Sequence, residues 1–114
     1  MKVIFISGKY RAGSEWGLVE NIRKAEAAAI ELWKQGWVVL CPHKNTAHFG
    51  GLCPDRVWLE GDIELLKRCD AVFMLDNWHD SEGAMEEYRI AKELNKEIIF
   101  EVSPNRGEGD EKQD

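Results

Sequence analysis

Near its start, the stretch SEGAMEEYRIAKEL, residues 81–94, carries three glutamates, and only one of them falls on the face that should be buried. Stepping by three and four residues along the predicted helix places Glu87 on the apolar stripe. Glu86 is about 100° further around the helix and should point to solvent, whereas Glu82 lies in the entry turn and complements the helix N-terminus. A carboxylate on an inner stripe is costly unless it is paired or hydrogen-bonded. The other members of the stripe are Ala84, Ala91 and Leu94, with Tyr88 beside them.

A second acid repeats this anomaly in the predicted helix over residues 55–69. Asp62 follows Trp58 by four residues and precedes Leu65 by three, so it also lies on an inner stripe. Two such acids on helices that flank one sheet edge indicate a pair facing one pocket, with the alternative that each reaches water at the rim of its stripe. Paired acids suit chemistry at an anomeric carbon, where one carboxylate attacks C1 of a sugar and the other protonates or orients the leaving group.

Four short apolar runs and three stretches of helical spacing must position these acids. Near-continuous apolar strands are typical of a parallel sheet that helices cover on both faces. The alternating order predicts an α/β three-layer sandwich, with a parallel Rossmann-like or flavodoxin-like sheet of four to five strands and right-handed crossovers. The predicted strands are residues 2–6, 37–41, 71–75 and 97–102, and the predicted helices are residues 16–35, 55–69 and 81–94. This single domain spans residues 1–102, followed by a disordered charged tail over 103–114.

The first loop, SGKYRAG, follows a strand directly, and ligands of open parallel sheets bind beyond the carboxyl ends of the strands. Gly8 and Gly13 let backbone amides approach an anion, and Lys9 and Arg11 supply charge. The loop lacks both the GxGxxG and the GxxxxGK[ST] patterns, so a glycine turn with two solvated cations explains it equally well. Tyr10, at the tip of the loop, is placed to stack on a base or a sugar.

The second loop, CPHKNTAHFGG, carries two histidines between two cysteines. The spacing of Cys41, His43, His48 and Cys53 matches none of the usual zinc patterns, so we expect no metal and no cofactor. His43, Asn45 and His48 are expected to line the pocket or to cap neighbouring backbone. The three cysteines of the chain are odd in number and lack a CxxC spacing, which indicates reduced thiols.

Composition limits the class of protein further. The chain has 114 residues, of which 44% are hydrophobic and 32% charged, as in an ordinary globular domain. Its net charge of −6 argues against a nucleic-acid partner, because phosphate neutralisation needs a basic face. No run approaches the ~20 apolar residues of a membrane span and no signal peptide is visible, so we expect a cytoplasmic protein without a membrane partner.

Four blocks of the sequence resemble the nucleoside 2-deoxyribosyltransferase-like superfamily, and in particular a small bacterial and phage branch related to the 2′-deoxynucleoside 5′-phosphate N-hydrolases. The blocks are SGKYR at 7–11, CPHKNTAHF at 41–49, WLEGDIELLKRCDAV at 58–72 and the S-x-G-A-x-x-E pattern at 81–87. The resemblance implies that Glu87 is the nucleophile and that Asp62 handles the sugar and the leaving base. It implies further that Ser81 contacts a 5′-phosphate and that Tyr10 is an active-site aromatic.

The expected function is cleavage or exchange of the N-glycosidic bond of a (deoxy)nucleoside or nucleoside 5′-monophosphate; the alternative is a non-catalytic nucleotide-binding or sensing module on the same fold. The resemblance also implies a homo-oligomer, a dimer or tetramer, which five tryptophans in a small chain would suit. The catalytic residues are expected to be Glu87, Asp62 and Tyr10. The expected substrate-binding residues are Ser7, Gly8, Lys9, Arg11, His43, Asn45, His48, Ser81 and Gly83.

Overall fold

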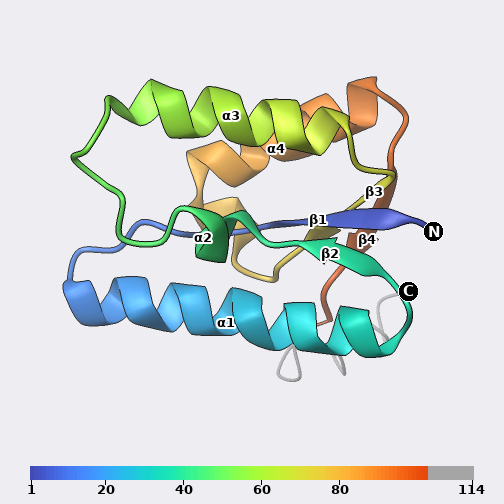
Figure 1. Cartoon of the computed structure of the whole chain (residues 1–114), viewed down its shortest axis with the longest axis horizontal. Helices are drawn as coiled ribbons and strands as arrows, with labels where there is room; N and C mark the ends of the chain where they lie inside the picture. The colour runs from blue at the N-terminus through green and yellow to red at the C-terminus, as the bar shows by residue number, and fades with distance from the viewer. Residues whose placement is uncertain (103–114) are drawn as a thin grey trace.

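The computed structural model describes residues 1–102, which form a four-stranded, fully parallel sheet with helices on both faces (Figure 1). The strands lie in the order β2-β1-β3-β4, so the predicted α/β sandwich is confirmed. The strands are β1 (Val3–Ser7), β2 (Val38–Leu40), β3 (Ala71–Met74) and β4 (Glu97–Phe100). The helices are α1 (Glu15–Lys34), α2 (Pro42–Asn45), α3 (Asp55–Lys67) and α4 (Glu82–Glu93), with a 3-10 helix, η1 (Trp78–Asp80). The predicted charged tail, residues 103–114, lies outside the described residues.

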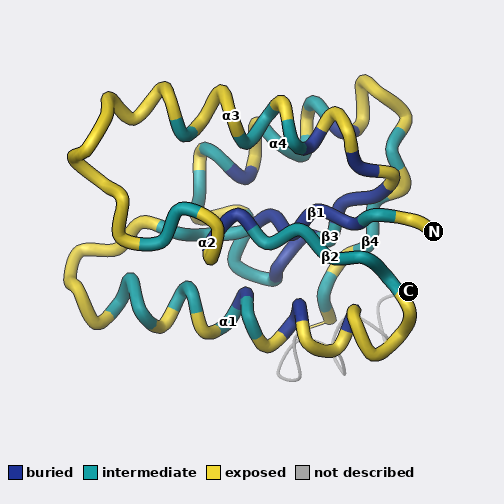
Figure 2. Tube along the Cα trace, in the orientation of Figure 1, coloured by how far each residue is buried: buried dark blue, intermediate teal, exposed yellow. Residues whose placement is uncertain are grey.

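The alternation of side chains along β1 builds the two halves of the core. Ile4 and Ile6 pack toward α1 in one cluster, and Phe5 packs toward α3 and α4 in the other. All three are fully buried, and Figure 2 shows the buried strands between helices whose outer faces are exposed. The helices contribute small or branched residues to these clusters: Ala25, Ala28, Ala29 and Leu32 from α1, Leu66 from α3, and Ala84 and Ala91 from α4.

One half of the sheet face on the α1 side has no helix over it within residues 1–102. The long helices α3 and α4 share the opposite face, whereas α1 is the one long helix on its own face within residues 1–102 (Figure 1). A groove of about 410 Å³ lies beside α1 over the β3 and β4 half of the sheet, and it is lined mainly by Ala27, Ala28, Leu32, Phe73 and Ile99. No helix within these residues has the length and apolar character to cross a bilayer.

Two local details differ from the sequence prediction. The loop after β2 contains the one-turn helix α2, which begins with Pro42, a residue suited to the first helical position. Leu94 was predicted to face the core, but this was wrong: it is 45% exposed, because α4 ends at Glu93 and Leu94 is its C-cap residue. Gly36 follows α1 with a φ of 98°, a left-handed conformation that glycine adopts readily.

Gly8→Ala is expected to destabilise the fold, because an added Cβ would lie 2.5 to 2.9 Å from three side-chain atoms of Leu75. Leu75 is fully buried and cannot move aside freely, so we expect a loss of about 1–3 kcal/mol in the free energy of unfolding. Gly61→Ala, inside α3, is the control: its Cβ would meet nothing within 4 Å, and alanine favours the helix by about 1 kcal/mol. Urea unfolding measures both, and equal stabilities would contradict this packing.

Candidate active site

Glu87 and Ser7 meet where α4 crosses the carboxyl end of β1. The Ser7 hydroxyl donates a hydrogen bond of 2.6 Å to Oε1 of Glu87, and Ser7 is fully buried. Burial raises the pKa of Glu87 to about 8, a change that the Ser7 hydrogen bond opposes and the nearby Asp62 charge increases. Glu87 is half-buried, and its carboxyl points inward to the end of β1, where it contacts Ser7.

Asp62 provides the second acid from α3. It is half-buried, and burial raises the pKa of its carboxyl to about 6. Because the Asp62 charge acts on the pKa of Glu87, the two carboxyls lie within electrostatic reach of each other. Two acids whose environments push their pKa values apart are the usual arrangement for dividing acid and base roles between carboxyls.

The first turn of α4 separates the three glutamates, as their spacing predicts. Glu86 is exposed and pairs with Arg89, which also donates to Glu93 at 2.6 Å. This pairing lowers the pKa of Glu86, opposite to the change at Glu87. Glu82 is exposed at the start of the helix, and Ser81 caps it by accepting a hydrogen bond of 3.0 Å from the Ala84 amide. The Ser81 hydroxyl has no acceptor for its own proton among residues 1–102, so it can donate to a ligand.

The loop after β1 is held in place by several side chains. Its Tyr10 hydroxyl accepts a hydrogen bond of 3.1 Å from the His48 amide, which links the first loop to the second. Asn21 of α1 donates to the backbone oxygens of Tyr10 and Arg11 at 3.0 and 3.2 Å. His48 has a φ of 65°, so the second loop holds a non-glycine residue in a left-handed conformation beside Tyr10. The structure thus brings Tyr10 and His48 together.

His43 lies beneath this loop and is only 4% exposed. Its Nε2 is 3.3 Å from the Gly8 carbonyl oxygen, and its ring packs edge-on against Tyr10 with centroids 6.1 Å apart. Burial lowers the pKa of His43, so the ring is neutral at pH 7 and Nε2 is the nitrogen that donates to Gly8. Nδ1 is buried without a hydrogen-bond partner among residues 1–102, which leaves an acceptor for a water or ligand.

The remaining predicted binding residues are less closely gathered. Arg11 extends to α3, where it pairs with Asp55 at 2.9 Å in an exposed contact. The backbone amide of Lys9 donates to the side chain of Asn77 at 3.0 Å, which ties the first loop to the loop after β3. Asn45 is exposed at the end of α2, whereas Gly83 lies half-buried in the first turn of α4.

The thiols and other acids do not form a metal site within residues 1–102. No group of three or more histidine, cysteine or acidic side chains there is arranged to hold an ion. Cys41 is half-buried, Cys53 exposed and Cys69 buried, and all three are free thiols. Asp70 accepts a hydrogen bond of 2.8 Å from the Val3 amide, so it orders the start of β1.

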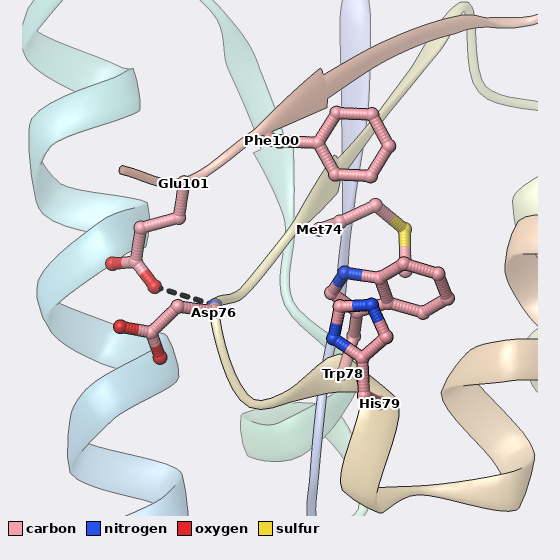
Figure 3. Close-up of a pocket in the computed structure, with 6 residues that line it drawn as sticks. All are labelled: Met74, Asp76, Trp78, His79, Phe100 and Glu101. Atoms are coloured by element: carbon pink, nitrogen blue, oxygen red, sulfur yellow. Dashed lines mark hydrogen bonds between the residues drawn. The ribbon is translucent and has the colours of Figure 1, made fainter. Parts of the chain in front are cut away.

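A cavity of about 200 Å³ lies at the carboxyl ends of β3 and β4. Figure 3 shows the aromatic rings on one side and the carboxylates of Asp76 and Glu101 on the other. These carboxylates contact Lys24 of α1 at 2.7 and 3.3 Å, so they hold α1 to the sheet. Neither this cavity nor the groove beside α1 is lined by Glu87 or Asp62. The cavity is lined by Met74, Asp76, Trp78, His79, Phe100 and Glu101.

Two residues that hold the loops together were not predicted from the sequence. Asn21 and Asn77 fix the first loop from α1 and from the loop after β3. Asn21 lies on α1. Its role depends on the backbone conformation of the first loop, which residue spacing does not predict. Asn77 follows the predicted strand over residues 71–75, at the sheet edge where ligands of open parallel sheets bind, and a short amide side chain at that position is the signal that could have indicated it.

The arrangement is that of the nucleoside deoxyribosyltransferase-like fold. A solved structure of a 2-deoxyribosyltransferase from the psychrotolerant bacterium Bacillus psychrosaccharolyticus matches with a TM-score of 0.66 and 20% sequence identity. The match covers 92% of this chain and 79% of that one. A family model described as "Domain of unknown function (DUF4406)" matches residues 3–100, so the chain belongs to that family. No curated protein matches the chain.

Proposed function

We propose that this protein cleaves or exchanges the N-glycosidic bond of a (deoxy)nucleoside or nucleoside 5′-monophosphate. The observation that carries the proposal is the pair of half-buried acids: Glu87 contacts Ser7 at the carboxyl end of β1, and the charge of Asp62 is near enough to raise the pKa of Glu87. The structural neighbour is a 2-deoxyribosyltransferase, whose chemistry belongs to the same class. A pair of carboxyls, one attacking and one moving a proton, is what displacement at an anomeric carbon requires.

The reaction begins with proton transfer inside the pair. Glu87 has the higher pKa of the two, about 8 against about 6, so its proton must pass to Asp62 before it can attack. The Glu87 carboxylate then forms a bond to C1 of the sugar while the bond from C1 to the base nitrogen breaks. The electron pair of that bond leaves with the base, which takes the proton from Asp62.

The second step releases the enzyme. Water attacks C1 and gives its proton to Asp62, and the bond between Glu87 and the sugar breaks, which regenerates the Glu87 carboxylate. Attack by the nitrogen of a second base in place of water would complete an exchange instead. Both outcomes use the same two acids, so the site supports either a hydrolase or a transferase.

The remaining residues are proposed to hold the substrate. Tyr10, held by the His48 amide, stacks on the base or sugar, and the unpartnered Nδ1 of His43 accepts a hydrogen bond behind it. The free hydroxyl proton of Ser81 and the N-terminus of α4 suit a 5′-phosphate. Lys9 and Arg11 supply positive charge. Arg11 must leave its exposed ion pair with Asp55 to contact the phosphate, which costs little because exposed ion pairs are weak.

Release of free base from a panel of nucleosides and their 5′-monophosphates tests this function. We expect base release from at least one member and tighter binding of the monophosphate than of its parent nucleoside by calorimetry, because the phosphate adds charged contacts. Equal affinities would contradict phosphate recognition by Ser81 and the first loop. Ser14→Ala, which removes the hydroxyl that caps α1, is a control expected to leave both affinities unchanged.

A non-catalytic nucleotide-binding module is the second candidate. It is favoured by the raised pKa of Glu87, since a protonated carboxyl binds but does not attack. Binding of nucleotides without base release from any panel member, across pH 6 to 9, would establish it.

A homo-oligomer is proposed as the working form. Within residues 1–102, the groove beside α1 and the exposed indoles of Trp16 and Trp33, at 67% and 53%, provide apolar surface that a second copy could cover.

A further inference from the structure

Ser7 is an unusual residue to find at its place in the fold. It is one of two polar or charged residues, with His43, that are buried within residues 1–102, and its exposed fraction is zero. A hydroxyl buried without a hydrogen bond costs free energy, and alanine would fill the end of β1 without that cost. The hydroxyl therefore needs a reason to be there, and the Glu87 carboxyl is its hydrogen-bond partner.

The sheet holds Ser7 in a fixed orientation. Its carbonyl oxygen accepts a hydrogen bond of 2.8 Å from the Leu75 amide, and Ser7 is paired in register with Met74 of β3. Side chains alternate along β1, so Ser7 projects to the same face as Phe5, toward α4. A hydroxyl on a central strand is held more firmly than one on a loop, which is what precise placement of a reacting group requires.

We propose that Ser7 is a positioning residue for Glu87, whose hydroxyl fixes Oε1 and leaves Oε2 as the oxygen that attacks the sugar. The contact of 2.6 Å is at the short end of the range for a hydrogen bond between a hydroxyl and an oxygen acceptor. The first loop begins at Ser7, so the same residue ends the central strand and orients the acid. We propose this positioning role for Ser7 in place of the direct substrate contact expected from the sequence. The attack by Glu87 on the sugar rests on the proposed function.

The electrostatic consequence is specific. Burial and the Asp62 charge both favour the protonated form of Glu87, and the Ser7 hydrogen bond is the contribution that lowers its pKa. Removing the hydroxyl should therefore raise the pKa of Glu87 further and reduce the ionised fraction at neutral pH. A residue with a purely structural role would change stability without moving this titration.

The test is the titration of the Glu87 side-chain carboxyl by NMR in wild type and in Ser7→Ala, without ligand. We expect the pKa of Glu87 to be about one unit higher in Ser7→Ala, which corresponds to about tenfold less ionised Glu87 near pH 6. Ser7→Thr, which retains the hydroxyl, should restore the wild-type value. In Ser7→Cys, whose thiol is close to the serine hydroxyl in volume but a weak donor, the pKa of Glu87 should lie nearer to that in Ser7→Ala. This variant provides the measurement if Ser7→Ala does not fold.

Ser14→Ala is the matched control, because it also removes a serine hydroxyl that stabilises the fold. It should leave the Glu87 titration unchanged. An unchanged Glu87 pKa in both Ser7→Ala and Ser7→Cys would overturn the proposal.

Turnover separates this inference from the proposed function. If base release occurs, the high-pH limb of kcat/KM should move upward with the Glu87 pKa in Ser7→Ala, because the proposed reaction starts from the pair of acids that still holds the Glu87 proton. Below that limb turnover should be about tenfold lower, since passing the proton to Asp62 becomes less favourable by the same factor. A limb that stays in place would overturn the role of Ser7 while the function stands. A shifted Glu87 titration with no base release from any nucleotide would support the role of Ser7 and defeat the proposed function.

Discussion

Glu87→Gln is expected to reduce base release by more than about a thousandfold while the fold and nucleotide binding remain, because the amide keeps the shape of the side chain and loses the charge that attacks C1. The amide can still accept the Ser7 hydrogen bond through its oxygen, so the end of β1 should not be disturbed. Single-turnover kinetics with the best substrate of the panel measures the chemical step, and calorimetry measures the affinity.

Glu86→Gln is the control for this substitution. Glu86 is the adjacent residue in the sequence, but it is exposed and paired with Arg89, so its replacement should leave turnover within about twofold. A Glu87→Gln variant that still turns over at a wild-type rate would end the assignment of Glu87 as the nucleophile, whatever its melting temperature. Loss of activity in both variants would show instead that the first turn of α4 is sensitive to any change.

The distinction between Glu86 and Glu87 could be predicted from the sequence, because the helical period is a strong signal when the flanking positions are small and apolar. Ala84 and Ala91 are both buried, and Glu87 lies between them on the same face. The period could not predict where the helix ends, and Leu94 is exposed for that reason. The last residue of a helix depends on its capping geometry, which is set by the conformation of the loop that follows.

The partner of Glu87 could not be predicted in the same way. Ser7 and Glu87 are 80 residues apart, and their contact depends on the strand order, since α4 must cross β1 rather than another strand. The sequence predicted that both lie at the carboxyl edge of the sheet, which is a coarser statement than a hydrogen bond. Arg11 shows the same limit, because its pairing with Asp55 depends on how the loop before α3 returns to the first loop.

The second large effect expected of Glu87 is on stability, and it depends on pH. The folded protein raises the pKa of this carboxyl from 4.5 to about 8, so the native state binds a proton that the unfolded chain releases. Stability from this group is complete below about pH 4.5 and is lost as the pH rises through 8. Each pKa unit corresponds to about 1.4 kcal/mol, so the upper bound on the loss is about 5 kcal/mol. Asp62 changes stability with the same sign between about pH 4 and 6.

Glu87→Gln removes this titration, so its stability relative to wild type should increase steadily between pH 5 and 8.5. Urea unfolding of both proteins at several pH values measures the difference, in which the contributions of other groups largely cancel. Glu86→Gln again provides the contrast. Arg89 lowers the pKa of Glu86, so the stability that this carboxylate contributes is lost only below about pH 4.5. The difference in unfolding free energy between Glu86→Gln and wild type should therefore be constant above pH 5. Parallel curves for Glu87→Gln and wild type would mean that Glu87 reaches water in solution. A widening gap would mean that the fold keeps a buried acid at a cost in stability, as expected of a residue retained for its chemistry.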